Sequence, residues 1–249
     1  MITLIKRAFR KLLNRLGFDL HRISAPLSST RVAPVPFLLP KIPPNEIANG
    51  DSAVFVVEPE WSNGNVSLLE LLIINTLIAK RAPKVLFEIG TFDGRTSMNM
   101  VSNAVKSATL YTLDLPKDDL EKTVYALHDF DKQYVDKTKS GLRFAGTAYE
   151  KQIIQLYGDS AKFDFSPYYG KMEFIFIDGS HAYEYVKNDT AVALKLAADS
   201  ALIIWHDYDP FWMGVVQALD EFLVSGGIFQ NIRNVAGTTL AVMEFSRRT

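Results

Sequence analysis

From residue 52 to residue 249 the sequence alternates between short apolar runs and longer amphipathic stretches. The apolar runs are typical of buried strands and the amphipathic stretches of helices. This alternation predicts a parallel sheet, because parallel neighbours need a crossover connection that is usually a helix. We therefore predict a Rossmann-like α/β fold whose seven-stranded, mostly parallel sheet has helices on both faces. The expected strands cover residues 84–89, 109–113, 153–157, 172–177 and 201–205, and an antiparallel pair follows at 228–232 and 238–245.

Helix starts are marked by two local patterns. Ser67 and Glu70 have the spacing of a capping box, which predicts a helix from there to about residue 80. A second helix is expected to follow the first strand and to reach about residue 106. Asp209 and Pro210 resemble an N-cap followed by a first-turn proline, so a helix is expected to begin there.

The first 51 residues differ from the rest of the chain. Residues 1–23 predict an amphipathic helix that carries six basic residues against one acidic residue, whereas the remaining chain has 21 basic and 27 acidic residues. A general nucleic-acid binder would carry basic charge on its main domain, so we expect no nucleic-acid partner. The helix could lie on an anionic membrane, or pack on the domain or on a second subunit of a homo-oligomer. Residues 24–51 contain six prolines and read as a linker.

The chain contains no cysteine, which excludes a disulfide scaffold, thiolate zinc sites and a cysteine nucleophile. No apolar run approaches the roughly 20 residues needed to cross a bilayer, and no signal-peptide pattern is visible. We therefore expect a cytoplasmic protein, either free or held at the inner face of the membrane by residues 1–23.

Acidic residues follow every predicted parallel strand, and two of these strands are followed by a histidine as well. In open α/β sheets, ligands bind beyond the carboxyl ends of the strands, so these side chains are expected to surround one site. A packed scaffold does not need such regularity. The residues are Glu88 and Asp93 around the first strand end, then Asp114, then Asp159 with Ser160, then Asp178 with His181, and finally His206 with Asp207.

The glycine turn after the first strand is not a phosphate-binding motif. Gly90 and Gly94 form the pattern E-x-G-x-x-x-G, and Phe92 stands where a dinucleotide-binding turn needs its middle glycine. Two carboxylates beside the turn would repel a phosphate and would suit a cationic ligand. Asp114, some twenty residues later, is placed to accept hydrogen bonds from ribose hydroxyls. A tight strand-to-helix turn and an ordinary turn aspartate remain the alternatives.

These motifs resemble those of class I S-adenosylmethionine (SAM)-dependent methyltransferases over roughly residues 60–245. The nearest likeness is to a bacterial group that includes sugar and macrolide-sugar O-methyltransferases and cephalosporin hydroxylase-like proteins. The motifs that carry the resemblance are residues 87–97, 158–160, 176–189 and 204–208, of which the third is long and specific.

The resemblance implies roles for most of the strand-end residues. Glu88, Gly90 and Gly94, with Thr91 in the same turn, would line the methionine and ribose part of SAM. Asp114 would hold the ribose, and the adenine would lie between Asp159 and Ser160. In metal-dependent relatives, residues at the positions of Asp178 and Asp207 bind a divalent cation, and a histidine at the position of His181 is the base.

His206 departs from that pattern, because an acidic ligand often stands at its position. A set of Asp178, His206 and Asp207 would weaken the case for Mg²⁺ and tolerate Mn²⁺, and a site without any metal is the other possibility. The hypothesis is thus transfer of a methyl group from SAM to a hydroxyl of a sugar, glycan or related polyhydroxylated small molecule. His181 would be the general base, assisted by Asp178.

Two other functions compete with this one: a non-catalytic SAM-binding or assembly subunit, and a nicotinamide-dependent oxidoreductase. The missing middle glycine argues against the latter. In residues 117–139, 11 of 23 side chains are charged, so we expect a solvated outer helix there rather than a lid.

Overall fold

The computed structural model describes residues 37–49 and 52–247. The chain divides into two units, of which residues 36–249 form the second. The helix predicted at 1–23 and the first part of the predicted linker lie outside the described residues. Among the described residues, no helix is long and apolar enough to cross a membrane.

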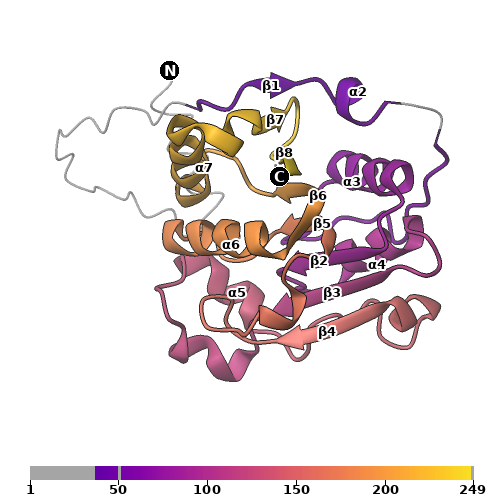
Figure 1. Cartoon of the computed structure of the whole chain (residues 1–249). Helices are drawn as coiled ribbons and strands as arrows, with labels where there is room; N and C mark the ends of the chain where they lie inside the picture. Colours follow the sequence, from indigo (N-terminus) through magenta and orange to yellow (C-terminus); the bar gives the residue numbers. More distant parts are fainter. Residues whose placement is uncertain (1–36, 50–51, 248–249) are drawn as a thin grey trace, which may run out of the picture. The chain divides into compact units, whose positions relative to one another are not determined.

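A single eight-stranded sheet forms the centre of this unit (Figure 1). Its strand order is β1-β7-β8-β6-β5-β2-β3-β4, and every neighbouring pair is parallel except the two pairs made by β8. The predicted Rossmann-like, mostly parallel fold is confirmed, with one strand more than expected. The strands are β1 Lys41–Ile42, β2 Val85–Ile89, β3 Thr109–Asp114, β4 Ile153–Tyr157, β5 Met172–Ile177, β6 Ala197–Trp205, β7 Arg233–Val235 and β8 Ala241–Ser246.

The additional strand comes from the proline-rich segment. β1 pairs with β7 at the sheet edge, and the buried side chain of Leu39 precedes it. The backbone N–H of Leu39 donates to the Tyr208 hydroxyl at 3.2 Å, and that of Leu38 donates to Asp220 at 3.1 Å. Residues 37–49 are therefore part of the folded unit and not a free linker. Prolines are compatible with an edge strand because an edge leaves backbone N–H groups unpaired.

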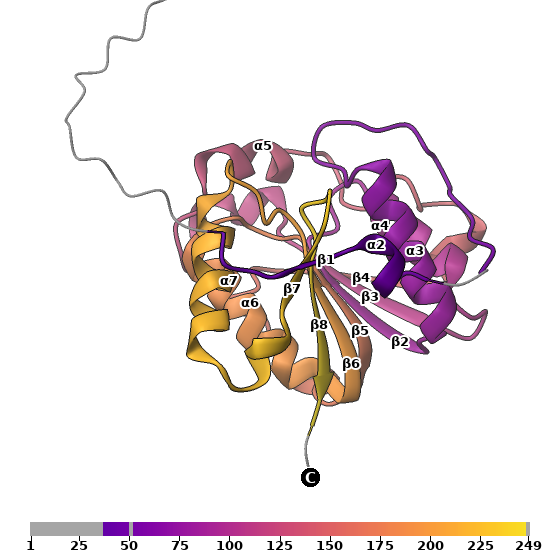
Figure 2. The same ribbon diagram turned by 90° about the horizontal axis from the view of Figure 1, so that it is seen from above.

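Helices cover both faces of the sheet, as predicted. Figure 2 shows α3 and α4 on one side and α6 and α7 on the other. The capping box is confirmed, since the Ser67 side chain and the Glu70 carboxylate each accept a hydrogen bond from the other residue's backbone N–H. The α-helices are α2 Pro44–Ile47, α3 Leu68–Arg81, α4 Arg95–Asn103, α5 Lys132–Val135, α6 Tyr183–Leu196 and α7 Met213–Ser225. Short 3-10 helices occupy Lys117–Lys122, Asp129–Asp131, Ala148–Gln152, Ser166–Tyr168 and Gly227–Asn231.

Two predicted elements near the C-terminus were wrong. α7 begins at Met213 rather than at Pro210, because Asp209 closes a turn by accepting hydrogen bonds from the N–H groups of Phe211 and Trp212. Residues 228–232 lie mainly in a 3-10 helix, and the strand β7 starts only at Arg233. Gly226 and Gly227 both have positive φ, which glycine adopts readily, and they lie where α7 gives way to this 3-10 helix.

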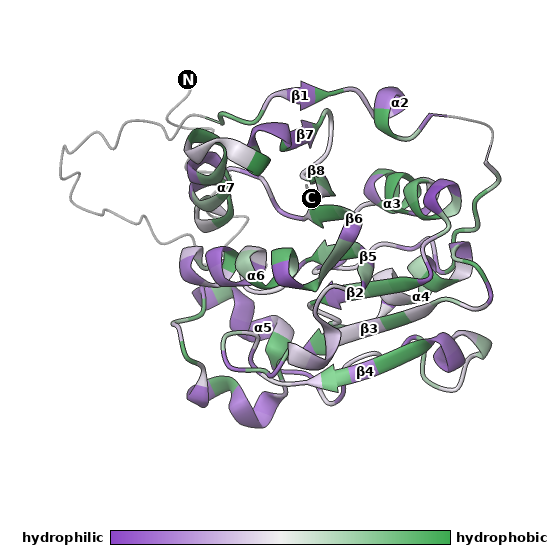
Figure 3. Ribbon diagram, viewed as in Figure 1, coloured by the Kyte–Doolittle hydropathy of each residue, from purple (hydrophilic) through white to green (hydrophobic). Residues whose placement is uncertain are grey.

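The main core lies between the sheet and the α3–α4 pair. Leu71, Ile74 and Ile78 of α3 pack in one buried cluster with Phe174 and Phe176 of β5. Figure 3 shows the central strands largely in the hydrophobic colour. This is expected for parallel strands covered on both faces. The polar strand-end residues are consequently confined to the rim of the sheet.

Candidate active site

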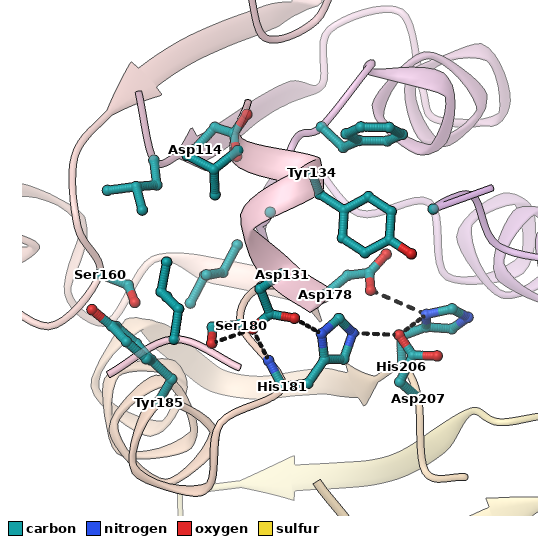
Figure 4. A pocket seen from close by; sticks show the side chains of 18 of the residues that line it. Asp114, Asp131, Tyr134, Ser160, Asp178, Ser180, His181, Tyr185, His206 and Asp207 are labelled. Atoms are coloured by element: carbon teal, nitrogen blue, oxygen red, sulfur yellow. Dashed lines mark hydrogen bonds and ion pairs between the residues drawn. The ribbon is translucent and has the colours of Figure 1, made fainter. Parts of the chain in front are cut away.

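A cavity of about 330 Å³ opens at the carboxyl ends of β2, β3, β4, β5 and β6. It is lined by eight of the residues that the sequence analysis singled out, so the acids after β3, β4, β5 and β6 surround one space, whereas those around the end of β2 do not line it. No lysine or arginine is among its lining residues. Figure 4 shows several of these side chains converging from different strands. The nominated residues that line it are Gly90, Asp114, Asp159, Ser160, Asp178, His181, His206 and Asp207.

Three of the residues expected to contact the cofactor, Glu88, Thr91 and Gly94, do not line the cavity, and neither does Asp93, which pairs with Arg143. Thr91 is buried, and its hydroxyl lies 2.6 Å from that of Thr112. Gly94 has φ +88 and starts α4 where a Cβ would meet Phe144, so its glycine serves packing. The positions of Glu88, Thr91 and Gly94 therefore do not favour the direct cofactor contacts expected of them.

Glu88 is completely buried beneath the rim. One carboxylate oxygen accepts hydrogen bonds from the hydroxyls of Ser97 and Thr112, and the other, Oε1, has no partner among the described residues. Burial raises the pKa of Glu88 to about 8, although the two hydroxyls lower it. Glu88 therefore contributes less negative charge at neutral pH than the sequence suggests.

Gly90 is required by the close approach of two strand ends. It has φ +100, and a Cβ at this position would lie 1.9 Å from the carbonyl oxygen of Asp178. The tips of β2 and β5 can therefore touch only because residue 90 lacks a side chain. This contact places the glycine turn and Asp178 on the same wall of the cavity.

His181 lies between two carboxylates. Its Nδ1 is 2.5 Å from Asp131 Oδ1 and its Nε2 is 2.7 Å from Asp207 Oδ2 (Figure 4). Trp212 stacks on the ring with a centroid separation of 3.6 Å. Burial alone would lower the pKa of His181, but the hydrogen bonds that its ring donates to Asp131 and Asp207 outweigh this effect and raise the pKa to about 9.

His206 is held by three carboxylates. Its Nδ1 is 3.0 Å from Asp178 Oδ1 and 2.9 Å from Asp207 Oδ2, while Nε2 is 3.3 Å from Glu70 Oε2. Burial opposes the charged ring, but the attraction of Asp178 and Asp207 raises its pKa well above the usual value. Asp207 adopts a left-handed φ of +63, which is rare for a residue other than glycine and turns its carboxylate toward both histidines.

The donor atoms at the end of β5 and β6 fit a divalent cation. Asp178, His181 and Asp207 each offer a ligand atom, and these atoms lie within 4.8 Å of one another. The sequence had nominated His206 as the nitrogen ligand with the same two aspartates. Four carboxylates, those of Glu70, Asp131, Asp178 and Asp207, surround the two histidines. Even two imidazolium rings leave this cluster negative, so it suits a cationic guest.

The charged insertion at 117–139 was expected to be a solvated outer helix, and this was wrong. It forms short 3-10 helices and the four-residue α5, and Leu127, Asp131, Tyr134 and Val135 line the cavity. Three of its apolar or aromatic side chains, Leu127, Tyr134 and Val135, face the site, whereas Val124 and Phe130 are exposed. The insertion therefore covers the cavity as a lid does.

The insertion also contacts both acids that the sequence assigned to the nucleoside. Asp114 accepts hydrogen bonds from Ser140 and from Lys137, the latter at 2.9 Å. Asp159 accepts from the backbone N–H of Val124 at 2.8 Å and from the Tyr185 hydroxyl at 2.9 Å. Both acids also line the cavity. Each therefore holds the insertion in place and can still face a ligand.

Sequence reasoning missed Asp131 and the aromatic wall before α3. Asp131 is one of 11 charged residues in its segment, and nothing in the sequence separates it from the others. Trp61, also on the cavity wall, lies in a stretch without periodic signals. Only the folded chain brings these residues beside His181 and the glycine turn.

Comparison with known proteins gives a consistent result. Residues 87–208 match the sequence model of a methyltransferase domain, which spans the glycine turn through the end of β6. No curated protein has a sequence that matches the chain significantly.

Solved structures with this fold include two O-methyltransferases. That of TomG from Streptomyces achromogenes, which is involved in tomaymycin synthesis and was solved with SAM, is 16% identical with a TM-score of 0.52; the match covers 75% of this chain and 83% of the other. An O-methyltransferase from Bacillus cereus in complex with S-adenosylhomocysteine (SAH) is 15% identical with a TM-score of 0.53, covering 75% and 84%. At these identities the likeness establishes the fold.

Proposed function

We propose that this protein is a SAM-dependent O-methyltransferase that methylates a hydroxyl of a sugar, glycan or related polyhydroxylated small molecule, with His181 as the general base. The observation that carries the proposal is the meeting of Asp114, Gly90 and His181 in one cavity. The first two residues suit the nucleoside of a donor, and the third suits proton removal from an acceptor. The matched methyltransferase domain and the shared fold agree with this division of the site.

The cavity favours SAM over a dinucleotide on electrostatic grounds. Its rim carries several carboxylates, and none of the described lining residues is a lysine or arginine, so a pyrophosphate would meet like charge, with only the two carboxylate-paired histidines as cations. The sulfonium and the amino group of SAM are positive and would be attracted instead. Gly90 lines the cavity, so the backbone of the glycine turn faces the space that the donor would fill.

The reaction needs alignment and the removal of one proton. The acceptor oxygen attacks the methyl carbon, the bond from that carbon to sulfur breaks, and SAM becomes SAH. The proton of the hydroxyl passes to Nε2 of His181, which must first be released from its contact with Asp207. When Asp207 releases His181, it still has His206 as a hydrogen-bond partner.

A divalent cation would be held by Asp178 and Asp207 with the imidazole of His206, which contacts both carboxylates and leaves His181 as the base, and it would lower the pKa of the acceptor hydroxyl. The mixed oxygen and nitrogen donors are compatible with Mn²⁺. Without a metal, the same two carboxylates would accept hydrogen bonds from acceptor hydroxyls.

The acceptor side of the cavity suits a neutral ring. Trp61 and Phe211 line it, and 61% and 56% of their respective surfaces are exposed. Flat apolar walls combined with carboxylates favour a molecule that has both an apolar face and several hydroxyls. An acceptor that carries phosphate groups would find only His181 and His206 as cations among the lining residues, and both are already paired with carboxylates.

The test is transfer of labelled methyl groups from SAM to a crude glycan extract and to a panel of neutral glycosides. The wild-type protein is expected to label an acceptor, and His181→Ala is expected to lose at least about 100-fold in turnover while its affinity for SAH stays within a few-fold. Turnover that survives His181→Ala would remove the base assignment. Binding of SAH without any transfer would favour a non-catalytic subunit.

A further inference from the structure

The insertion supplies His181 with its most buried partner. Asp131 stands at the junction of the 3-10 helix Asp129–Asp131 and α5, and only 4% of its surface is exposed. Its Oδ1 lies 2.5 Å from His181 Nδ1, and its Oδ2 accepts from the backbone N–H of His181 at 3.0 Å. The hydroxyl of Ser180 donates to the same Oδ2 at 2.7 Å. The carboxylate is thereby fixed in one orientation by three contacts.

The two carboxylates that touch His181 differ in their other partners. Asp207 Oδ2 also lies 2.9 Å from His206 Nδ1, so its charge is shared between two rings. For Asp131, His181 is the only cationic partner among the described side chains. A neutral His181 should therefore keep its single proton on Nδ1, facing Asp131, and leave the lone pair on Nε2.

We propose that Asp131, carried by the lid-like insertion, is the positioning residue that holds His181 with Nδ1 protonated and Nε2 directed to the acceptor. This inference rests on the proposed role of His181 as the base. On this proposal, the residues that follow the strands are not enough to orient His181. The insertion must also be closed over the cavity, because it supplies Asp131. Aromatic contacts hold it there, since His128 packs on Trp212 at 5.1 Å and Phe130 packs on Phe211 at 5.2 Å between ring centroids.

Replacement of Asp131 by asparagine makes a specific prediction about the ring. The backbone N–H of His181 and the Ser180 hydroxyl both donate toward the Oδ2 position, so the single carbonyl oxygen of an asparagine is needed there. Its NH₂ group then faces His181 Nδ1, which must become an acceptor. The ring proton moves to Nε2, and the base loses the lone pair it needs. An Asp-to-Asn change beside a catalytic histidine has this effect in serine proteases.

The first measurement is the ¹⁵N spectrum of the histidine side chains, recorded from neutral pH upward until His181 is neutral. The chain has only four histidines, and the His181 signals are identified by their loss in His181→Ala. We expect the Nδ1–H form in the wild type and the Nε2–H form in Asp131→Asn. Asp129→Asn is the matched control, because Asp129 lies in the same 3-10 helix with 93% of its side chain exposed. It should give the wild-type spectrum.

The second measurement is kinetic. Asp131→Asn should lower kcat at least about 100-fold and leave the KM for SAM within a few-fold, whereas Asp129→Asn should change neither. A merely structural role would alter thermal stability without moving the ring proton.

Two results would overturn the proposal: a neutral wild-type His181 protonated on Nε2, or an Asp131→Asn variant that keeps the Nδ1–H form. The first of these is read from the wild type alone, so it decides even if the variant fails to fold. The spectra need no substrate, so a protein that transfers no methyl group would refute the proposed function and still report on Asp131.

Discussion

The positive charge of His181 at neutral pH opposes its proposed role as a base. A base must be neutral, yet the two carboxylates on its ring raise its pKa to about 9. We therefore predict that kcat/KM rises about tenfold per pH unit below this value and levels off above it, because only the neutral ring accepts a proton. Asp131, Asp207 and, through Asp207, His206 are the charged groups that set this value. Initial rates at low substrate, measured across the pH range, test it. A profile that is flat up to about pH 9 would contradict it.

The titration of Glu88 predicts a property that falls as the pH rises, namely the stability of the folded protein. The pKa of Glu88 is raised from 4.5 to about 8 in the folded protein because burial disfavours its charge. The unfolded chain therefore releases this proton earlier, and the folded state loses stability as the pH rises from about 4.5 to 8. Glu88→Gln removes the titration, so its unfolding free energy should depend less on pH over that window.

The measurement is denaturant unfolding of both proteins near pH 5 and near pH 8.5. At the lower pH they should agree within about 1 kcal/mol, because glutamine presents an NH₂ where protonated glutamate presents a hydroxyl. At the higher pH the variant should be the more stable. Parallel pH dependence in the two proteins would show that Glu88 is ionised in the folded state.

Individual residues differ in how far sequence could assign them. Asp178 and Asp207 were found because each directly follows a strand, and strand ends share one rim. Glu88 was misplaced because a motif reveals the residue but not whether its carboxylate faces the cavity or the interior. Asp131 was missed because a long-range contact with a residue 50 positions away leaves no local pattern.

At the level of elements, the contact between the β2 and β5 tips yields a stability prediction. Gly90→Ala should lower the unfolding free energy by about 3 kcal/mol or more, because its Cβ would lie 1.9 Å from a backbone oxygen and its φ is +100. Gly146→Ala is the control, since Gly146 also has positive φ, at +76, but has nothing within 4 Å of its Cβ position. It should cost about 1 kcal/mol. Equal losses would show that the tips do not approach this closely.

Elements with strong periodic or capping signals were predicted well. α3 starts at its capping box, and the strands β4 and β5 have the expected bounds. The failures were elements defined by tertiary contacts. β1 exists because residues 41–42 meet β7, and the insertion is held over the cavity by long-range contacts such as that of Asp131 with His181. Neither contact is written in local sequence.

At the scale of the whole molecule, we propose that residues 1–23 attract anionic membranes through their six basic residues. The full-length chain should co-sediment with vesicles that contain anionic lipid, and a chain lacking residues 1–23 should not. Vesicles of neutral lipid are the control, because apolar contact alone would bind the chain to neutral and anionic vesicles alike. Unchanged co-sedimentation after the deletion would end this proposal and favour packing of the segment on protein.

The proposed function depends on one property of the cavity: its carboxylates must accept a sulfur nucleoside rather than a dinucleotide. Calorimetric titration with SAH and with NAD tests this directly, with Asp114→Asn as the variant at the expected ribose contact. We predict one SAH bound per chain, an affinity reduced about tenfold or more in Asp114→Asn, and no binding of NAD. Heat with NAD and none with SAH would contradict it.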